Sequence, residues 1–364
     1  MILIVFALLI ATGLIWFNTA APFGSKIKGS YKTQLANSAN HNGKTFINQE
    51  ETAIKKEGVS YFTVLKEFSS GTQNGAPTNA IKNVEFDTKK FNALDSKLHV
   101  TWFGHSTLLM KINGTTILTD PVFSKRTSPV KWTGTKQFDF ENDFSVEVLP
   151  KIDILLISHD HYDHLDYKVI KQLHTKVKSI VVPLGVKAHL QKWNIDNNKI
   201  TELDWWESAT INTTQIVCAP ARHFSGRRGS DQFHSLWCSF VIKNDDESVF
   251  FSGDSGYGKH FKEIGEKYGP FNLTAMECGQ YNKYWPEIHM FPEETHRAHL
   301  DVKGEYLLPI HWGKFKLSLH SWTDPVDRLN AAAQEIGTKV LLPQPGDIVS
   351  ATEFGKTGVK WYEI

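Results

Sequence analysis

Residues 152–164 read IDILLISHDHYDH, and this stretch decides the fold. Its first six residues are mostly apolar and rich in β-branched isoleucine, a pattern typical of a buried strand. The polar residues that follow therefore lie in the loop at the carboxyl end of that strand. Loops in this position carry binding and catalytic residues more often than the strands that support them.

The loop concentrates three histidines and two aspartates within residues 159–164. Imidazole nitrogens and carboxylate oxygens are ligands that zinc accepts, and a divalent cation offsets carboxylates that would otherwise repel one another. His159 and His161 are two residues apart, so both can point the same way in an extended loop. Asp163 and His164 follow a further turn and can face a second point nearby. The spacing therefore predicts two metal ions side by side.

Composition sets wide limits on the function. The chain has 364 residues, of which 41% are hydrophobic and 22% are charged, which suits one large domain or two small ones. The net charge of +1 gives no basic excess, so we expect no nucleic-acid partner. Cys218, Cys238 and Cys278 are scattered without C-x-x-C spacing, which argues against a thiolate zinc site.

The amino-terminal segment carries conflicting signals. Residues 2–17 are apolar apart from Thr12 and Gly13, but the run is short for a transmembrane helix and long for the core of a signal peptide. Lysines follow at positions 26, 28 and 32. We expect residues 1–21 to be an uncleaved anchor or an export signal, so that the protein is membrane-associated through this segment or exported. A buried core helix is the alternative, and the side of the membrane stays open.

Residues 22–96 are polar and weakly periodic, which predicts an irregular extension without recognisable chemistry. Residues 97–364 are expected to form the catalytic domain. Alternating apolar runs within 99–119 and 236–251 predict hairpins, and strands alternate with helices from about residue 260 to 342. This mixture favours an α/β fold in which two sheets pack face to face with helices outside.

A site for two metals needs more ligands than one loop offers. His223, Asp254 and His311 each follow an apolar strand, as the first motif does. Strand-end loops that converge on one rim would form a pocket. We therefore assign His159, His161 and His223 to the first metal. The second metal is assigned Asp163, His164 and His311. Asp254 is expected to bridge the two metals.

With this pattern of residues the chain resembles the metallo-β-lactamase superfamily, in which H-x-H-x-D-H and later single His, Asp and His residues bind a dinuclear zinc centre. More narrowly, it is similar to the N-acylphosphatidylethanolamine-hydrolysing phospholipase D family. The resemblance covers about residues 98–345. It is carried by TWFGH at 101–105, LTDP at 118–121, ISHDHYDHLD at 157–166, ELDWW at 202–206, GDSGY at 253–257 and IHWG at 310–313.

The resemblance implies a four-layer αββα sandwich that holds two Zn²⁺ ions per chain. It implies a phosphoric diester hydrolase that cleaves between phosphate and an N-acylethanolamine by a hydroxide shared between the metals, with a phospholipid and a membrane surface as partners. By position, His289 and His299 match histidines near the family's substrate pocket, and either could orient the headgroup or protonate the leaving alkoxide. With Asp254, they are the expected catalytic residues.

Further side chains are candidates for supporting roles. Arg222, Arg227 and Arg228 surround His223, and a guanidinium fork suits a phosphate. Carboxylates or histidines that hold ligand imidazoles in one tautomer are also expected. The candidates for that role are Asp160, Asp166 and His105, and candidates for lining an acyl channel are Trp132, Trp205, Trp206, Tyr284 and Trp285.

Two alternatives stay open. A metallo-lactonase, or another hydrolase of the same superfamily such as a nuclease, would use the same metals, although a nuclease should show a basic surface. A non-catalytic, membrane-tethered zinc-binding protein is an alternative of another class. A structural zinc is usually closed by four protein ligands, which argues against that second alternative. The oligomeric state has no sequence signal.

Overall fold

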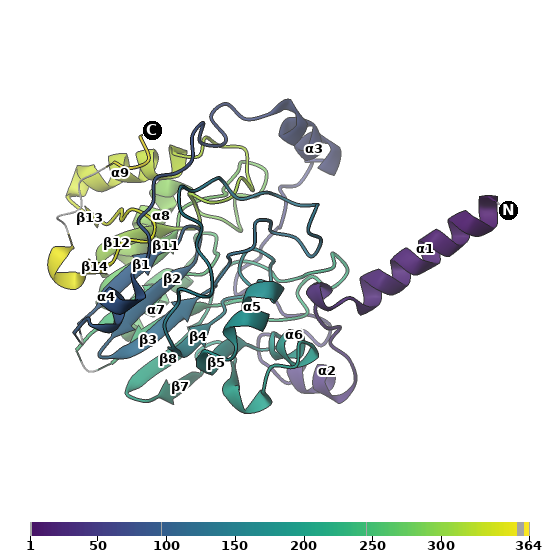
Figure 1. Ribbon diagram of the computed structural model, residues 1–364, viewed down its shortest axis with the longest axis horizontal. Helices are drawn as coiled ribbons and strands as arrows, with labels where there is room; N and C mark the ends of the chain where they lie inside the picture. The colour runs from purple at the N-terminus through teal and green to yellow at the C-terminus, as the bar shows by residue number, and fades with distance from the viewer. Residues whose placement is uncertain (1, 96, 245, 355–359, 364) are drawn as a thin grey trace.

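The apolar run that precedes the histidine-rich loop forms the strand β4 (Ile152–Leu156) in the middle of a sheet. A computed structural model describes residues 2–95, 97–244, 246–354 and 360–363 (Figure 1). The described residues leave out Met1, Ser96, Asp245, residues 355–359 and Ile364. Parts of the predicted segments 1–21, 22–96 and 97–364 therefore lie outside the described residues.

Within the described residues, the first sheet has the order β14-β1-β2-β3-β4-β5-β6. β1, β2 and β3 form an antiparallel meander, and β3 to β6 run parallel. The strands around β4 are β14 (Val349–Ser350), β1 (His99–Trp102), β2 (Leu108–Ile112), β3 (Thr115–Thr119), β5 (Val177–Pro183) and β6 (Ile200–Leu203).

The second sheet has the order β13-β12-β11-β10-β9-β8-β7 within the same ranges. β7 to β10 pair antiparallel, and β10 to β13 pair parallel. Its strands are β7 (Ser208–Ile211), β8 (Thr214–Ala219), β9 (Ser239–Lys243), β10 (Ser248–Phe251), β11 (Phe271–Glu277), β12 (Gly304–Ile310) and β13 (Lys339–Val340).

Alternation of side chains explains why both faces of each sheet are covered. Ile154 and Leu156 of β4 point into the core between the sheets, whereas Leu155 and Ile157 point outward. A period of two places successive side chains on opposite faces, so apolar residues at every position require a covering layer on both sides.

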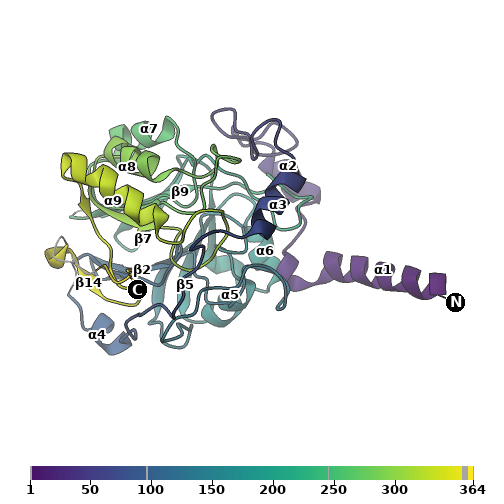
Figure 2. The same ribbon diagram turned by 90° about the horizontal axis from the view of Figure 1, so that it is seen from above.

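Helices supply the outer layers (Figure 2). Apolar residues of α4, α5 and α6 pack on the first sheet, and those of α7, α8 and α9 pack on the second. The predicted four-layer αββα sandwich is therefore confirmed. These helices are α4 (Thr88–Asn92), α5 (Tyr167–Leu173), α6 (Lys187–Lys192), α7 (His260–Tyr268), α8 (Pro292–Asp301) and α9 (Asp324–Ile336).

The amino-terminal helix α1 (Ile2–Thr19) projects away from the sandwich in both views (Figures 1 and 2). None of the helices in the described part of the chain has both the length and the apolar character that a membrane crossing requires. The expected membrane association through the N-terminal segment is therefore wrong.

Residues 22–96 contain more regular structure than the sequence indicated. Besides α4, the segment forms α2 (Gly29–Leu35) and α3 (Tyr61–Ser70), and it places Phe46 and Phe91 in the apolar cores. Helices this short are marginal alone, so their stability depends on contacts with the rest of the fold. This segment runs past the end of the sandwich where the histidine-rich loop lies.

Candidate metal centre

The predicted donors all leave the carboxyl ends of strands. The loop with His159 follows β4, His223 follows β8, Asp254 follows β10 and His311 follows β12. The four loops meet at one end of the sandwich, where the donor atoms form groups within 4.8 Å of one another. The convergence expected from the shared placement of these residues is therefore what the fold produces.

The first group joins His159, His161 and His223. His161 Nδ1 lies 2.9 Å from His159 Nε2 and 3.3 Å from His223 Nε2. His223 Nδ1 donates to the carbonyl of Ile288 over 2.9 Å, so its Nε2 carries the lone pair. Nitrogen lone pairs that face one another are arranged for a shared cation rather than for one another.

The second group joins Asp163, His164 and His311, with His105 beside them. His164 Nε2 lies 3.5 Å from Asp163 Oδ2. His105 Nε2 contacts the same carboxylate oxygen over 2.8 Å. His105 was expected to fix a ligand imidazole, but it holds a carboxylate instead.

Asp254 stands between the two groups. Its Oδ2 is 3.1 Å from His164 Nε2 and 3.7 Å from His223 Nε2, while its Oδ1 is 3.0 Å from His311 Nδ1. One carboxylate therefore reaches donors of both groups, as a bridging ligand must. Gly253 in the preceding turn has φ of +56°, a backbone conformation that glycine adopts without strain.

Burial makes these side chains suitable ligands. It lowers the pKa of His159, His223 and His311 well below its usual value, which keeps the imidazoles neutral, the form that binds metal. Burial alone would raise the pKa of Asp254, but His164 outweighs it and holds that pKa well below its usual range. Asp254 and Asp163 in turn outweigh the burial of His164 and raise its pKa well above the usual value. The centre thus combines neutral imidazoles at His159, His223 and His311 with an ionised carboxylate, whereas the carboxylates around His164 favour its protonated form.

Two buried donor atoms fit a cation directly. His164 Nε2 and Asp254 Oδ1 are fully buried and make no hydrogen bond of good geometry, although each lies within 3.1 Å of another donor atom of the cluster. Unpaired buried polar atoms are costly, and metal coordination is one way to satisfy them. The structure brings together all of the predicted donors, and their role as ligands stays a prediction.

Comparison with known proteins agrees with this geometry. The Beta-lactamase superfamily domain matches residues 115–312. The chain belongs to the metallo-β-lactamase superfamily. It is a metal-dependent hydrolase of that superfamily, which confirms the expected class of enzyme. The matched region contains the donor residues of both groups, whereas residues 22–96 lie outside it.

Relatives of this metallo-β-lactamase-superfamily hydrolase support the narrower resemblance. It is 46% identical over 261 residues to an uncharacterized protein of Mycobacterium tuberculosis, covering 71% of this chain and 70% of the relative. It is 36% identical over 250 residues to the N-acyl-phosphatidylethanolamine-hydrolyzing phospholipase D 1 of Caenorhabditis elegans, covering 65% and 69%. A mitochondrial enzyme of that description from Saccharomyces cerevisiae is 34% identical over 267 residues, covering 71% and 55%.

Solved structures of the superfamily share the fold. A metallo hydrolase from the archaeon Ignicoccus hospitalis superimposes with a TM-score of 0.53 at 21% identity, covering 70% of this chain and 97% of that one. A diiron β-hydroxylase from Streptomyces venezuelae gives a TM-score of 0.52 at 18% identity, covering 71% and 55%. At these identities the likeness concerns the fold alone.

Asp120 supports the centre of this hydrolase from the end of β3. Its Oδ2 accepts hydrogen bonds from His164 Nδ1 over 2.8 Å and from the Ser158 hydroxyl over 2.6 Å, and its Oδ1 accepts from Ser158 N over 2.8 Å. This contact leaves the other nitrogen of His164 free for the cluster. Asp120 lies in the LTDP motif at 118–121, but the sequence alone indicated no role for it.

The carboxylates expected in that role lie elsewhere. Asp160 contacts His189 Nε2 over 3.1 Å and accepts from Gly226 N over 2.7 Å, so it joins loops behind the centre. Asp166 caps α5 and binds Ser124. The partner of an imidazole depends on which loops meet, and the spacing of residues in one loop does not contain that information.

His289 lies beside the cluster, as the resemblance implied. It forms a group with His223 and Asp254, and its ring is 5.1 Å from that of His311. The carboxylate of Glu277, at the end of β11, lies 3.5 Å from His289 Nδ1 and also accepts from Met290 N over 2.6 Å. Burial raises the pKa of Glu277 to about 7. Sequence reasoning missed Glu277.

His299 is not brought to the cluster. It lies on α8, where its Nδ1 is 2.7 Å from the hydroxyl of Thr274, behind the second sheet. Burial lowers its pKa to about 4. This position gives His299 a packing role at the helix–sheet interface and no contact with the centre.

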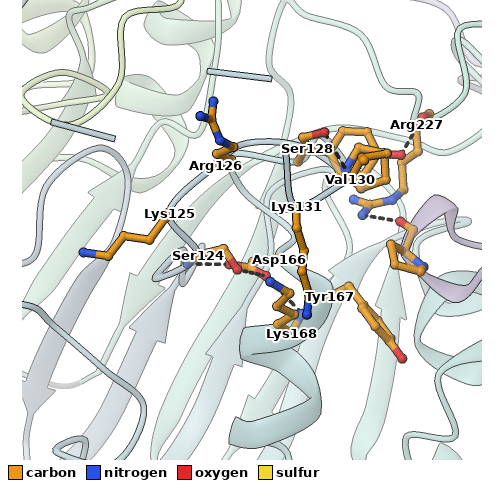
Figure 3. A pocket seen from close by; sticks show the side chains of 13 residues that line it. Ser124, Lys125, Arg126, Ser128, Val130, Lys131, Asp166, Tyr167, Lys168 and Arg227 are labelled. Carbon is orange, nitrogen blue, oxygen red and sulfur yellow. Dashed lines mark hydrogen bonds between the residues drawn. The ribbon is translucent and has the colours of Figure 1, made fainter. Parts of the chain in front are cut away.

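The three candidate phosphate-binding arginines bond to the protein itself. Arg227 donates to the carbonyls of Asp160 and Pro22, and Figure 3 shows its side chain in the wall of a separate small pocket beside α5. Arg228 donates to the carbonyl of Gly24 over 2.7 Å. Arg222 contacts the N-terminal extension. None of the three is among the described residues that line the cavity over the metal centre.

That cavity has a volume of about 320 Å³. His161, Asp163, His223, Asp254 and His311 form its floor, and the rest of its lining is largely apolar. Of the tryptophans proposed for an acyl channel, Trp285 is the one that lines it, whereas Trp132 is exposed and Trp205 is buried in the core. The walls come from both the sandwich and the extension: Phe224, Trp285, Ile288 and Leu317; and Ile54, Tyr61, Val64 and Phe68.

Proposed function

We propose that this protein is a zinc-dependent phosphodiesterase of the phospholipase D type that hydrolyses N-acylphosphatidylethanolamine-like lipids. The observation that carries the proposal is the position of the donor cluster at the floor of an apolar cavity. A polar reaction centre under apolar walls suits a substrate whose charged phosphate is joined to hydrocarbon. The names of the relatives in Caenorhabditis elegans and Saccharomyces cerevisiae support the same substrate class.

The proposed centre holds two divalent cations. His159, His161 and His223 would hold one and Asp163, His164 and His311 the other, with Asp254 between them. When bound, such a pair supplies Lewis acidity and lowers the pKa of water, so no serine or cysteine nucleophile is required. Zinc is proposed because imidazole nitrogens dominate the donor set. Iron is the competing metal, since imidazole suits both and a fold neighbour is a diiron enzyme.

The chain's own residues would orient the substrate and exclude water. His289 lines the cavity next to the donors, and Glu277 holds its Nδ1 side, so its other nitrogen is available for a phosphate oxygen or the leaving alkoxide. The apolar walls would desolvate the phosphodiester, which strengthens each polar contact made to it. Arg222, Arg227 and Arg228 have no part in this proposal because their guanidinium groups are bonded elsewhere.

The decisive experiment incubates the purified protein with a mixed lipid extract, with and without a chelator, and follows the lipids by mass spectrometry. We expect loss of N-acylphosphatidylethanolamine and release of phosphatidic acid, abolished by chelation, with zinc found by elemental analysis. Asp163→Asn should lose metal and turnover together. The matched control is Asp143→Asn, which removes an exposed carboxylate paired with Lys125.

A lactonase is the competing outcome within the superfamily. Turnover of bis-p-nitrophenyl phosphate is therefore compared with turnover of an acyl-homoserine lactone on the same preparation. Hydrolysis of the lactone alone would contradict the phosphodiesterase proposal. Unchanged lipid turnover in a metal-free Asp163→Asn protein would favour the non-catalytic alternative.

A further inference from the structure

We propose that residues 48–71 of the N-terminal extension form one wall of the active site and bind a long hydrocarbon chain attached to the scissile phosphodiester. This inference rests on the proposed function for the identity of that chain. The segment lies outside the matched family domain, which begins at residue 115, and its sequence showed no recognisable chemistry. Its role follows from where the fold places it.

One face of α3 is turned toward the metal centre. Tyr61, Val64 and Phe68, spaced by three and four residues, line the cavity whose floor holds the donor residues. Residues three or four apart lie on one side of a helix. Val64 and Phe68 are half-buried on this side and Tyr61 is exposed at its edge, whereas Phe62 and Leu65 are 75% and 66% exposed on the other side. In Figure 1, α3 stands at one end of the molecule, apart from the helices that cover the sheets.

Contacts with the loop that follows β11 hold α3 in this position. The ring of Phe68 stacks on that of Trp285, with centroids 6.3 Å apart and an interplanar angle of 11°. The hydroxyl of Tyr284 bonds to Glu67, and Lys56 N donates to the carbonyl of Tyr284 over 2.7 Å. The helix is therefore docked along one side, and that side faces the cavity.

Arg222 anchors the irregular segment that leads into α3. Its guanidinium group donates to the Thr52 hydroxyl over 3.0 Å and to the carbonyl of Glu51 over 2.8 Å, and it pairs with Glu287 over 3.1 Å. Glu287 also accepts from Ala53 N over 2.7 Å. Arg222 precedes a candidate ligand in sequence, so one loop carries both a metal donor and the anchor of the opposite wall.

Asn48 joins the extension to that ligand directly. Its amide donates to the carbonyl of His223 over 2.9 Å, and its oxygen accepts from His223 N over 3.1 Å. This paired contact fixes the backbone of His223 against the extension. Because the extension bonds to both the N–H and the carbonyl of a candidate donor residue, it is part of the site rather than a linker.

The chemistry of the lining identifies the occupant. Val64, Phe68, Trp285, Ile288 and Leu317 offer apolar surface that begins beside the donor cluster. A hydrocarbon chain that leaves the scissile phosphate would bury its first methylenes against these residues. Affinity should therefore rise with chain length until the wall is covered, because each buried methylene adds a similar increment.

The test measures binding of N-acylethanolamines with four and sixteen acyl carbons by equilibrium dialysis to the purified full chain. Val64→Trp fills the cavity from the wall and should lower the preference for the longer chain by about tenfold or more, the effect of excluding roughly two methylenes. Phe62→Ala, on the outward face of the same helix, should keep the wild-type preference. Equal preference in the wild type and Val64→Trp would overturn the proposal.

A second variant tests the anchor without relying on turnover. Arg222→Ala should increase amide hydrogen exchange in residues 51–71 and reduce the chain-length preference, because the wall would no longer be held. Unchanged exchange there would contradict the proposed anchor. Chain-length preference that depends on Val64 in a protein without phosphodiesterase activity would refute the proposed function but keep the wall. Phosphodiesterase activity without such a preference would keep the proposed function but refute the proposed wall.

Discussion

Replacement of Asp120 by asparagine should weaken metal binding although Asp120 belongs to neither donor group. The Asp120 side chain is fully buried, and its Oδ1 accepts from Ser158 N. An asparagine oxygen would keep that contact, which places the NH₂ group where Oδ2 faces His164 Nδ1 and Ser158 Oγ. An NH₂ group donates, so His164 would have to accept at Nδ1 and carry its proton on Nε2.

The magnitude follows from this change of tautomer. Nε2 of His164 is the nitrogen that faces Asp163 and Asp254, and a protonated nitrogen cannot bind a cation. Loss of a carboxylate behind a ligand histidine typically lowers metal affinity by about 10- to 100-fold. That range corresponds to about 1.4–2.8 kcal/mol, which matches the roughly 1.5–3 kcal/mol of a hydrogen bond to a charged group.

The assay is competition for Zn²⁺ against a chromophoric chelator, with urea unfolding in excess chelator to measure the stability of the metal-free fold. Asp153→Asn is the matched control, because Asp153 also accepts from a backbone amide, that of Thr116, over 2.9 Å but at the opposite end of β4. Wild-type affinity in Asp120→Asn would refute the reasoning. An equal loss in both variants would mean that the sheet, not the imidazole, was affected.

Two further outcomes are expected from buried titratable groups. Glu277→Gln keeps an acceptor for Met290 N but removes the charge beside His289, so kcat for bis-p-nitrophenyl phosphate should fall about tenfold with little change in KM, and wild-type kcat would contradict this. Burial lowers the pKa of His299 to about 4 from its usual 6.5, so the unfolded chain takes up the proton at a higher pH than the folded protein does. The neutral His299 therefore contributes about 3 kcal/mol to the free energy of unfolding above pH 6.5, and this contribution is lost as the pH falls toward 4. In urea titrations, His299→Gln should show less loss over that window, whereas an unchanged pH dependence would be inconsistent with the buried neutral histidine.

Strong local patterns were enough to predict the sandwich. The alternation in 99–119 and the apolar run before His159 predict strands that the structure contains as β1 to β4. The alternation of strands and helices predicted from about residue 260 to 342 also agrees with the observed α7, α8 and α9. The short edge strands β7 and β14 had no comparable signal, because few of their side chains are buried and their pairing partners stabilise them.

The extension is where sequence reasoning was least informative. α3 has no fully buried residue. The role of its Val64 and Phe68 becomes visible only in the fold, where they line one cavity together with Trp285 and candidate metal donors. A weakly periodic, polar segment looks the same whether it is a linker or a wall of a site. The expected membrane association was also wrong, because no helix among the described residues is both long and apolar enough to cross a membrane.

The sequence by itself predicted the candidate donors and their placement, because a histidine-rich loop after a buried strand and single histidines or aspartates after three other strands are typical of a metal centre. It also determined the superfamily. Only the tertiary structure decided which group supports each donor, since Asp120, Glu277 and Asn48 reach the centre from distant parts of the chain. The physical reason is that strand periodicity is local, whereas hydrogen-bond partners and cavity walls depend on how sheets and loops pack.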